Sequence, residues 1–174
     1  MFALVRAHMT ARDINGLLDA VIFNIAIGNV DSHAKNYSIL LGPRRTELAP
    51  LYDLMSGLDW PNITQNHAQD IDDQRRGRHI YRRHWRRMAE ECGLSKPGVI
   101  RRIDVLVTRL LAELSTAVDQ VTSMPAGSGP MLATFAKSIG DRASLVQANA
   151  RRDGDDVEPL SQDPPEQRRT YGDV

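Results

Sequence analysis

The segment from Ile14 to Ile27 constrains the fold more than any other part of this sequence. Apolar residues recur in it at helical spacing, and further apolar residues fill the opposite side of the predicted helix. A helix that is apolar on every side has no polar face to turn toward water, so we expect it to be buried. Thr10 and Asp13 have the spacing of a capping box and predict where this helix begins. The segment is too short to cross a membrane and contains Asp19 and Asn24, which favours a core helix.

The remaining patterns predict a mainly α protein with one small β-hairpin, an α+β fold class. The hairpin is expected between residues 37 and 49, with its turn at residues 42–45. Residues 59–81 are polar and are expected to be irregular. Residues 82–92 predict a helix, and a regular amphipathic helix is expected from Ser95 to Val118.

The domain organisation follows from a change in composition at Ser123. Residues 1–122 are expected to form the domain, and residues 123–130 are rich in Gly, Pro and Ser, which is typical of a linker. Residues 131–150 predict a weak helix. Residues 151–174 contain several prolines, many charges and few large apolar groups, so we expect them to be disordered.

Charge and cysteine content limit the functional classes. The chain has 174 residues, and its 22 Lys and Arg balance its 22 Asp and Glu. A net charge of zero argues against electrostatic capture of nucleic acid or a membrane as the main role. The single cysteine, Cys92, cannot form an internal disulfide or a cysteine zinc site. With no signal peptide or membrane span recognised, the expected location is the cytoplasm.

Asp31, Asn36 and Asp53 are the candidate catalytic constellation. Asp31 and Asn36 lie on one predicted loop after the buried helix, and Asp53 comes just past the predicted hairpin. Phosphoryl transfer uses an Asp that orients or deprotonates the attacking hydroxyl, together with an Asn and a second Asp that bind Mg²⁺. Because Mg²⁺ prefers hard oxygen ligands, Asn36 and Asp53 are suitable metal ligands. The order of helix, loop, hairpin and Asp also matches that of a kinase catalytic loop and its metal-binding segment.

Three segments resemble HipA-like serine/threonine kinases. Residues 24–38, NIAIGNVDSHAKNYS, are similar to the catalytic loop of that family, and residues 48–56, LAPLYDLMS, are similar to its metal-binding segment. Residues 83–94, with the helix after them, resemble its C-terminal helices. The resemblance implies the C-terminal helical lobe of a protein-kinase-like fold. It also implies ATP- and Mg²⁺-dependent phosphorylation of a protein Ser or Thr by the toxin of a toxin–antitoxin module.

The same resemblance implies roles for single residues. Asp31 would be the catalytic Asp, and Asn36 and Asp53 would bind Mg²⁺. His33 or Lys35 would neutralise charge that develops on the transferred phosphoryl group. The implied partners are a protein substrate and a small DNA-binding antitoxin.

The chain departs from the family pattern in two informative places. Before the buried helix it has no Gly-rich phosphate loop and no strand Lys for ATP, so we expect the N-terminal nucleotide lobe to be missing. A separate N-terminal lobe is therefore a further expected partner, and ATP binding by this chain alone is expected to be weak or absent. Family members often have Ile-Gly-Gly where this chain has Ile71, Asp72 and Asp73, and Asp is a poor substitute in a tight glycine turn.

Other interpretations of these residues remain open. Asp31 and Asn36 can simply cap a loop through the backbone. Asp31, His33 and Asp53 can instead be zinc ligands, although this requires a further His that is not clearly placed. The remaining histidines have no ligand spacing and are expected at the surface or in an interface; they are His8, His67, His79 and His84.

The run from Arg75 to Arg87 contains seven arginines and supports a second functional class. It can contact phosphates of tRNA or DNA, or an acidic partner. It can also be an ordinary helix that buries Trp85, Met88 and Cys92. Its solvated face then consists of Arg82, Arg83, Arg86 and Arg87. The alternative to a kinase is thus a non-catalytic scaffold whose Arg75–Arg87 face binds an antitoxin, a partner lobe or nucleic acid.

Overall fold

The computed structural model describes residues 1–125 and 129–154. Residues 126–128 of the predicted linker and residues 155–174 of the predicted disordered tail lie outside this part. The described helices are α1 (Phe2–His8), α2 (Ala11–Ile27), α3 (Arg82–Glu91), α4 (Lys96–Thr122) and α5 (Pro130–Ala150). The strands form two separate antiparallel hairpins, β1 (Ile39–Leu41) with β2 (Thr46–Leu48), and β3 (Asn66–Ile71) with β4 (Gln74–Arg76). The predicted class, mainly α with a small β component, is confirmed.

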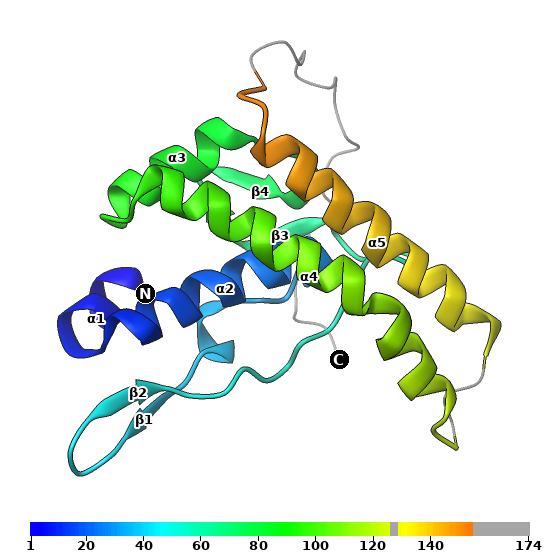
Figure 1. Ribbon diagram of the computed structural model, residues 1–174, viewed down its shortest axis with the longest axis horizontal. Helices are drawn as coiled ribbons and strands as arrows, with labels where there is room; N and C mark the ends of the chain where they lie inside the picture. The colour runs from blue at the N-terminus through cyan, green and yellow to red at the C-terminus, as the bar shows by residue number, and fades with distance from the viewer. Residues whose placement is uncertain (126–128, 155–174) are drawn as a thin grey trace, which may run out of the picture.

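Helix α2 is the central core element, as its sequence predicts. Nine of its 17 residues are buried. Figure 1 shows α4 crossing α2 and running beside α5, and the three helices contact one another. Burial on several sides explains why this helix has no continuous polar face.

The last part of α5 also belongs to the core. Ala143, Val146 and Ala150 join the same hydrophobic cluster as the buried residues of α2, α3 and α4. The weak helix expected over 131–150 is therefore present and packs against the body of the protein. The domain boundary at residue 122 stays a prediction, whereas the packing of the described residues extends to Ala150.

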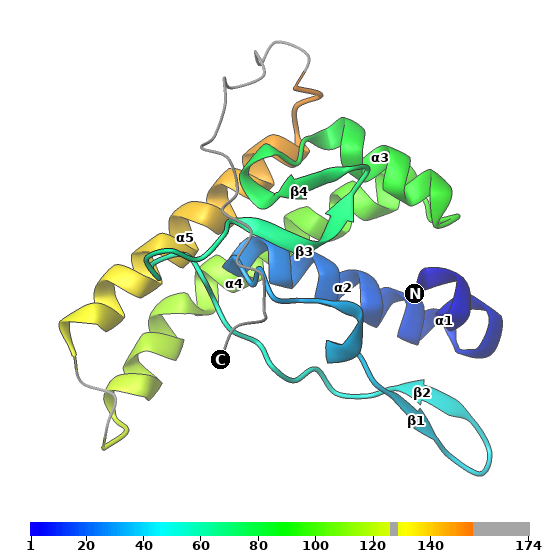
Figure 2. The same ribbon diagram turned by 180° about the vertical axis from the view of Figure 1, so that it is seen from behind.

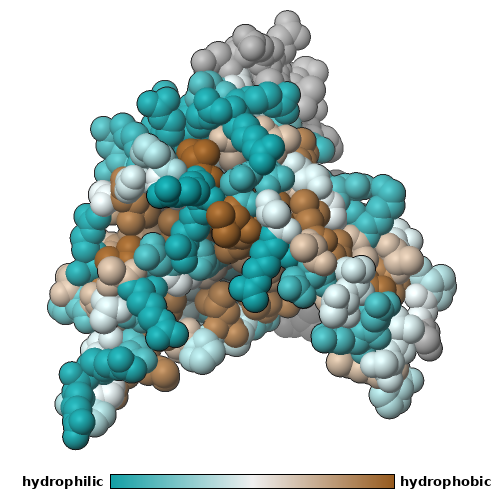
Figure 3. All heavy atoms as spheres, in the orientation of Figure 1, coloured by the Kyte–Doolittle hydropathy of each residue, from teal (hydrophilic) through white to brown (hydrophobic). Residues whose placement is uncertain are grey.

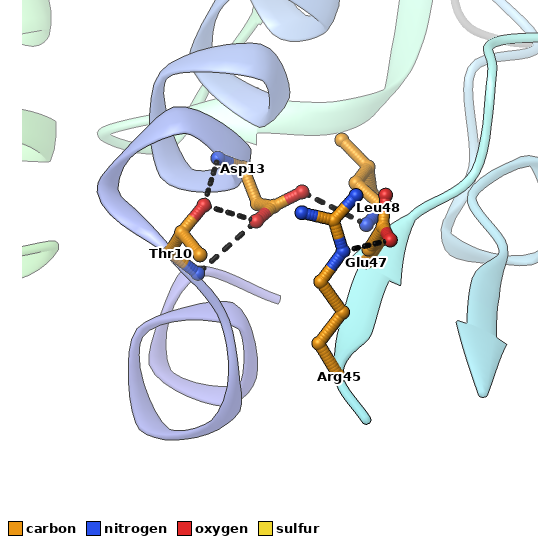
Figure 4. Close-up of polar contacts among 5 residues, drawn as sticks. All are labelled: Thr10, Asp13, Arg45, Glu47 and Leu48. Atoms are coloured by element: carbon orange, nitrogen blue, oxygen red, sulfur yellow. Dashed lines mark hydrogen bonds and ion pairs between the residues drawn. The ribbon is translucent and has the colours of Figure 1, made fainter. Parts of the chain in front are cut away.

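A capping box at the start of α2 also fixes the first hairpin. The Thr10 side chain accepts a hydrogen bond from the Asp13 N–H, as predicted, and the Asp13 carboxylate accepts one from the Thr10 N–H (Figure 4). The second Asp13 oxygen accepts the N–H of Leu48 on β2 at 3.1 Å. Hydrogen bonds from the Thr10 side chain and from the Leu48 N–H lower the pKa of Asp13. Arg45, which precedes β2, forms an ion pair with Glu47 of β2 beside this junction (Figure 4).

The second hairpin corrects the prediction that residues 59–81 are irregular. Strands β3 and β4 pair Ile71 with Gln74 across a two-residue turn. Asp72 and Asp73 both have left-handed backbones, with φ of 53° and 61°. Two residues with positive φ define the turn type that suits a two-residue hairpin, and Asp is among the residues that adopt it. Asp therefore forms the turn for which glycine is expected, and the Asp72 carboxylate binds Arg87 at 3.1 Å.

The surface separates polar and apolar regions. Figure 3 shows hydrophilic side chains along the top and the left edge of one face, and hydrophobic ones in its middle. Among residues 1–125 and 129–154, no helix has the length and apolar character needed to span a membrane.

Candidate functional site

The site begins where α2 ends. Gly28 has a left-handed backbone with φ of 71° and ends the helix, and the Asn29 N–H bonds the Asn24 carbonyl at 2.8 Å. Gly28 also contacts Gly57, whose N–H donates to the Gly28 carbonyl at 3.0 Å. A residue with a side chain would be strained at this φ, which explains the glycine at the turn into the loop.

Asn29 joins the two segments that carry the predicted site. Its side chain is buried, and its amide nitrogen donates to the Asn24 side-chain oxygen at 3.0 Å and to the Asp53 carbonyl at 3.2 Å. Its amide oxygen accepts the Asp31 N–H at 3.2 Å. One buried amide therefore positions the backbones of both predicted acidic residues. Asn24 is fixed in turn, because it donates to the Tyr37 hydroxyl at 3.0 Å.

The structure brings Asp31, Asn36 and Asp53 together. The Asn36 amide nitrogen donates to the Asp53 carboxylate at 2.9 Å and to the Asp31 carbonyl at 3.0 Å. Both aspartates are exposed. Asp53 has a left-handed backbone with φ of 55°, an uncommon conformation for a residue other than glycine. Such backbones are frequent at functional sites, where the surrounding contacts hold them in place.

His33 and Lys35 lie on the same loop. The His33 Nε2 is 3.4 Å from an Asp31 carboxylate oxygen, so these two side chains face one another. Lys35 has an exposed side chain, and its carbonyl accepts the Tyr52 hydroxyl at 2.9 Å. Tyr52 directly precedes Asp53, so this hydrogen bond connects the Asp31 loop to the metal-binding segment. The roles of His33 and Lys35 at a phosphoryl group remain predictions.

His67 supports the loop from the side opposite to solvent. It lies 1% exposed on β3, and its Nδ1 is 3.0 Å from the Asn29 carbonyl oxygen. Because a carbonyl only accepts, Nδ1 carries the proton. Burial and then the Arg142 guanidinium lower the pKa of His67 to about 4, so the ring is neutral near pH 7. The next residue, Ala68, also donates its N–H to the Val30 carbonyl at 2.8 Å.

The prediction that these histidines lie at the surface or in an interface is therefore wrong for two of them. His67 is buried in this network, and His84 is buried at the start of α3, where it accepts the Tyr81 N–H at 2.8 Å. The sequence reasoning assigned no role to Asn24, Asn29 or His67. The two asparagines show a recognisable pattern, because Asn24 lies in the last turn of an apolar helical run and Asn29 lies just past its end, where a buried amide needs a partner. His67 shows none, because it lies in a hairpin that was not predicted.

The donor set suits a hard divalent cation. The Asn36 amide nitrogen contacts the Asp53 carboxylate, and both side chains also carry oxygen atoms of the kind that Mg²⁺ prefers. In the described part of the chain, no three His, Cys, Asp or Glu side chains are grouped so as to hold a metal ion. The zinc interpretation of Asp31, His33 and Asp53 therefore lacks a ligand set there.

The Arg75–Arg87 face divides into structural and exposed arginines. Trp85 and Met88 are buried, as expected for an amphipathic helix, whereas Cys92, also expected to be buried, is half-buried. Arg82 and Arg83 donate to backbone carbonyls at and just beyond the end of α5, whereas Arg86 is exposed. A cavity of about 620 Å³ lies beside Arg86 between α3, α4 and α5; its charged lining residues are Arg82, Arg86, Lys96, Arg101, Asp104 and Arg151.

A buried helix, a loop with Asp31 and Asn36, and a second Asp beyond a hairpin form the arrangement found in the C-terminal lobes of protein kinases. The family model described as the HipA-like C-terminal domain matches residues 1–120. The chain belongs to this family.

Individual proteins support the same assignment. The chain is 34% identical over 137 residues to Y4mE of Sinorhizobium fredii, a protein named as a kinase, covering 79% of this chain and 32% of that one. It is 31% identical over 108 residues to the serine/threonine-protein kinase toxin HipA of Shewanella oneidensis, covering 62% of this chain and 24% of the toxin.

A solved structure is also similar. A chain in the Shewanella oneidensis complex of HipA, HipB and its operator DNA matches with a TM-score of 0.63 and 25% identity. The match covers 78% of this chain and 30% of that chain. The chain thus spans a third or less of the length of these relatives.

Proposed function

We propose that this chain provides the catalytic loop and the metal-binding segment of a HipA-like serine/threonine kinase. The reaction would be transfer of the γ-phosphoryl group of ATP to a protein Ser or Thr. The observation that carries this proposal is the Asn36 amide, which bonds both the Asp53 carboxylate and the Asp31 backbone. This contact supports one site in which an acidic base and two metal ligands converge.

Each residue has a defined part in this proposal. Asp31 would orient the acceptor hydroxyl and take its proton, since its carboxylate is exposed at the edge of the loop. Asn36 and Asp53 would hold Mg²⁺, which when bound neutralises phosphate charge. His33, facing Asp31, or Lys35 would add positive charge at the transferred group.

The proposed activity also needs groups that bind the phosphates of ATP. The relatives are at least three times as long as the matched part, and a nucleotide-binding lobe is a proposed partner of this segment. A small DNA-binding antitoxin is a further proposed partner, since the similar HipA chain is in a complex with HipB and operator DNA.

Manganese titration of the purified chain tests the site directly. We expect one Mn²⁺ to bind, with calorimetry as the readout, and Asp53→Asn and Asn36→Ala each to weaken binding by about tenfold or more. Asp119→Asn, which changes an exposed aspartate on α4, is the matched control and should bind as the unchanged protein does. Binding that is absent, or that survives both site substitutions, would contradict the proposal.

The second candidate function is a non-catalytic binding module. The cationic cavity beside Arg86 favours it, because five of the six charged side chains lining it are basic. An antitoxin with an acidic surface, a partner lobe or nucleic acid would bind there. Fluorescence anisotropy with labelled DNA tests the nucleic-acid arm: Arg86→Ala and Arg101→Ala should weaken binding and reduce its salt dependence. If DNA does not bind, or binds with no dependence on salt, nucleic acid is excluded as the partner of this cavity.

A further inference from the structure

A second cavity lies beside the metal-binding segment and has no part in the proposed phosphoryl transfer. Its volume is about 610 Å³, within the usual range for small-molecule sites. Four parts of the chain enclose it: the end of α2, residues 54–60, the second half of α4 and the first half of α5. Figure 1 shows residues 49–60 leaving β2 and running toward α4 and α5. The Ser138 hydroxyl fixes the far end of this segment by donating to Asp59 at 2.7 Å.

The walls of this cavity are apolar and aromatic. They include Phe23, Leu54, Met55, Trp60, Leu114 and Phe135. Three of these remain accessible, with exposed fractions of 43% for Leu54, 48% for Met55 and 54% for Trp60. Contiguous apolar side chains at a surface are a feature of interaction sites, ligand-binding grooves among them.

The charge at the cavity is negative. Glu113 is the charged residue of its lining, and it is exposed. The lysine on the adjoining turn of α5, Lys137, is already paired with Asp141 at 2.5 Å. A ligand with a positive charge beside an apolar body would complement both the walls and Glu113, whereas an anion would be repelled.

We propose that this cavity, the Trp60 cavity, binds a small apolar cation: an aromatic or branched aliphatic group that carries an amine. The apolar body would contact Trp60 and Leu114, and the ammonium would pair with Glu113 at the rim. The site goes beyond the proposed function, because it uses none of the residues assigned to phosphoryl transfer. It also adjoins them, since Leu54 follows Asp53 directly, so a bound ligand would restrict the metal-binding segment.

Two compounds of the same shape and opposite charge test this proposal. The probes are 2-naphthylmethylamine and 2-naphthoate, titrated into the ¹⁵N-labelled chain. The two tryptophans provide the readout, because Trp60 is exposed in the cavity while Trp85 is fully buried in the core. We expect the Trp60 indole signal to shift on titration and the Trp85 signal to stay in place, with the amine binding about fivefold tighter than the carboxylate. Trp60→Phe assigns the signal.

Two variants separate charge from shape. Glu113→Gln should remove the preference for the amine and leave weak binding of both compounds. Ala117→Phe, which fills the cavity from an exposed position on α4, should abolish binding of both. An unchanged Trp85 signal shows that each variant is folded. The proposal is overturned if neither compound shifts Trp60, if naphthoate binds as well as the amine, or if Trp60 shifts on dilution alone, which would identify a second copy of the chain as the occupant.

Discussion

The two hairpins are similar in size, but they relate to the body of the protein in different ways. Hairpin β1–β2 projects from it (Figures 1 and 2), and Leu40 and Leu41 are 53% and 84% exposed. Hairpin β3–β4 lies along the end of α2, where His67 and Ile71 are almost fully buried (Figure 2). The first hairpin is attached to α2 by the hydrogen bond between Leu48 and the Asp13 carboxylate. The second hairpin donates hydrogen bonds to the Asn29 and Val30 carbonyls from its His67 side chain and its Ala68 N–H.

This difference assigns separate tasks to the hairpins. Strands β1 and β2 lie between Asn36 and Asp53 in sequence, so their hairpin mainly returns the chain to the site. Hairpin β3–β4 comes after both residues and supports the loop through the core. Disturbing β3–β4 should therefore affect both folding and the site, whereas disturbing the tip of β1–β2 should affect neither strongly.

The largest effect is expected from Ile71→Ala. Ile71 is 3% exposed and belongs to the main hydrophobic cluster, so its truncation should lower the free energy of unfolding by about 2–5 kcal/mol. Leu41→Ala on the projecting hairpin is the control and should change it by less than about 0.5 kcal/mol. Urea denaturation measures both, and equal losses would show that the hairpins do not differ in this way.

Acidification should loosen β3–β4 before β1–β2. The pKa of His67 is about 4 in the folded chain and near 6.5 when unfolded, so the unfolded state binds the proton more readily. Stability from the neutral ring is complete above about pH 6.5 and falls by roughly 3 kcal/mol as the pH drops to about 4. The pKa of Asp13 is below its ordinary value of 3.8, so its bond to Leu48 persists to lower pH.

His67→Asn isolates this contribution, because an Asn amide can still donate to the Asn29 carbonyl but does not titrate. The difference in unfolding free energy between His67→Asn and the unchanged chain should vary between pH 6.5 and 4 and be constant above that range. A constant difference at every pH would contradict the prediction.

A smaller effect is expected at the joint between the loop and the metal-binding segment. Asn29→Leu keeps the shape of the side chain but removes the donors to Asn24 and to the Asp53 carbonyl, leaving oxygens unpaired. We expect a loss of about 1–3 kcal/mol together with weaker Mn²⁺ binding. Asn15→Leu, on an exposed position of α2, is the matched control. Mn²⁺ binding that stays unchanged in Asn29→Leu would show that Asn29 does not position the site.

The smallest effect should be a gain in stability. Asp73 has φ of 61°, which costs a residue with a side chain roughly 1 kcal/mol more than glycine. Asp73→Gly should therefore raise the unfolding free energy by a few tenths to about 1 kcal/mol, measured as a higher melting temperature. Asp70→Gly in strand β3 should lower it, because glycine weakens a strand interior. Destabilisation by Asp73→Gly would exclude turn strain at this position.

The sequence predicted the parts of the fold that depend on local pattern. The apolar run over 14–27 indicated a buried helix, and the capping pair at Thr10 and Asp13 marked its start. Strands β3 and β4 were not predicted, because β3 contains several polar side chains and its turn contains neither glycine nor asparagine. Its apolar anchor, Ile71, is one residue, too little for a periodic pattern.

The site was predictable as a set of residues but not as a geometry. The spacing of Asp31, Asn36 and Asp53 suggested a shared site, which agrees with the contact between Asn36 and Asp53. The interactions of Asn29 join positions 24, 31 and 53, and such long-range hydrogen bonds leave no periodic trace in a sequence. The roles of Asp31, Asn36 and Asp53 in catalysis and metal binding stay predictions.

Helix α5 limits where this chain can be shortened without exposing its hydrophobic core. The match to the family ends at residue 120, yet α5 supplies Ala143, Val146 and Ala150 to the core, and the Asn149 side chain bonds the Arg78 carbonyl at 2.8 Å. A polypeptide ended at residue 120 would retain the whole candidate site while exposing the apolar face that α5 covers. The segment that the family model matches is therefore shorter than the unit that packs around one core.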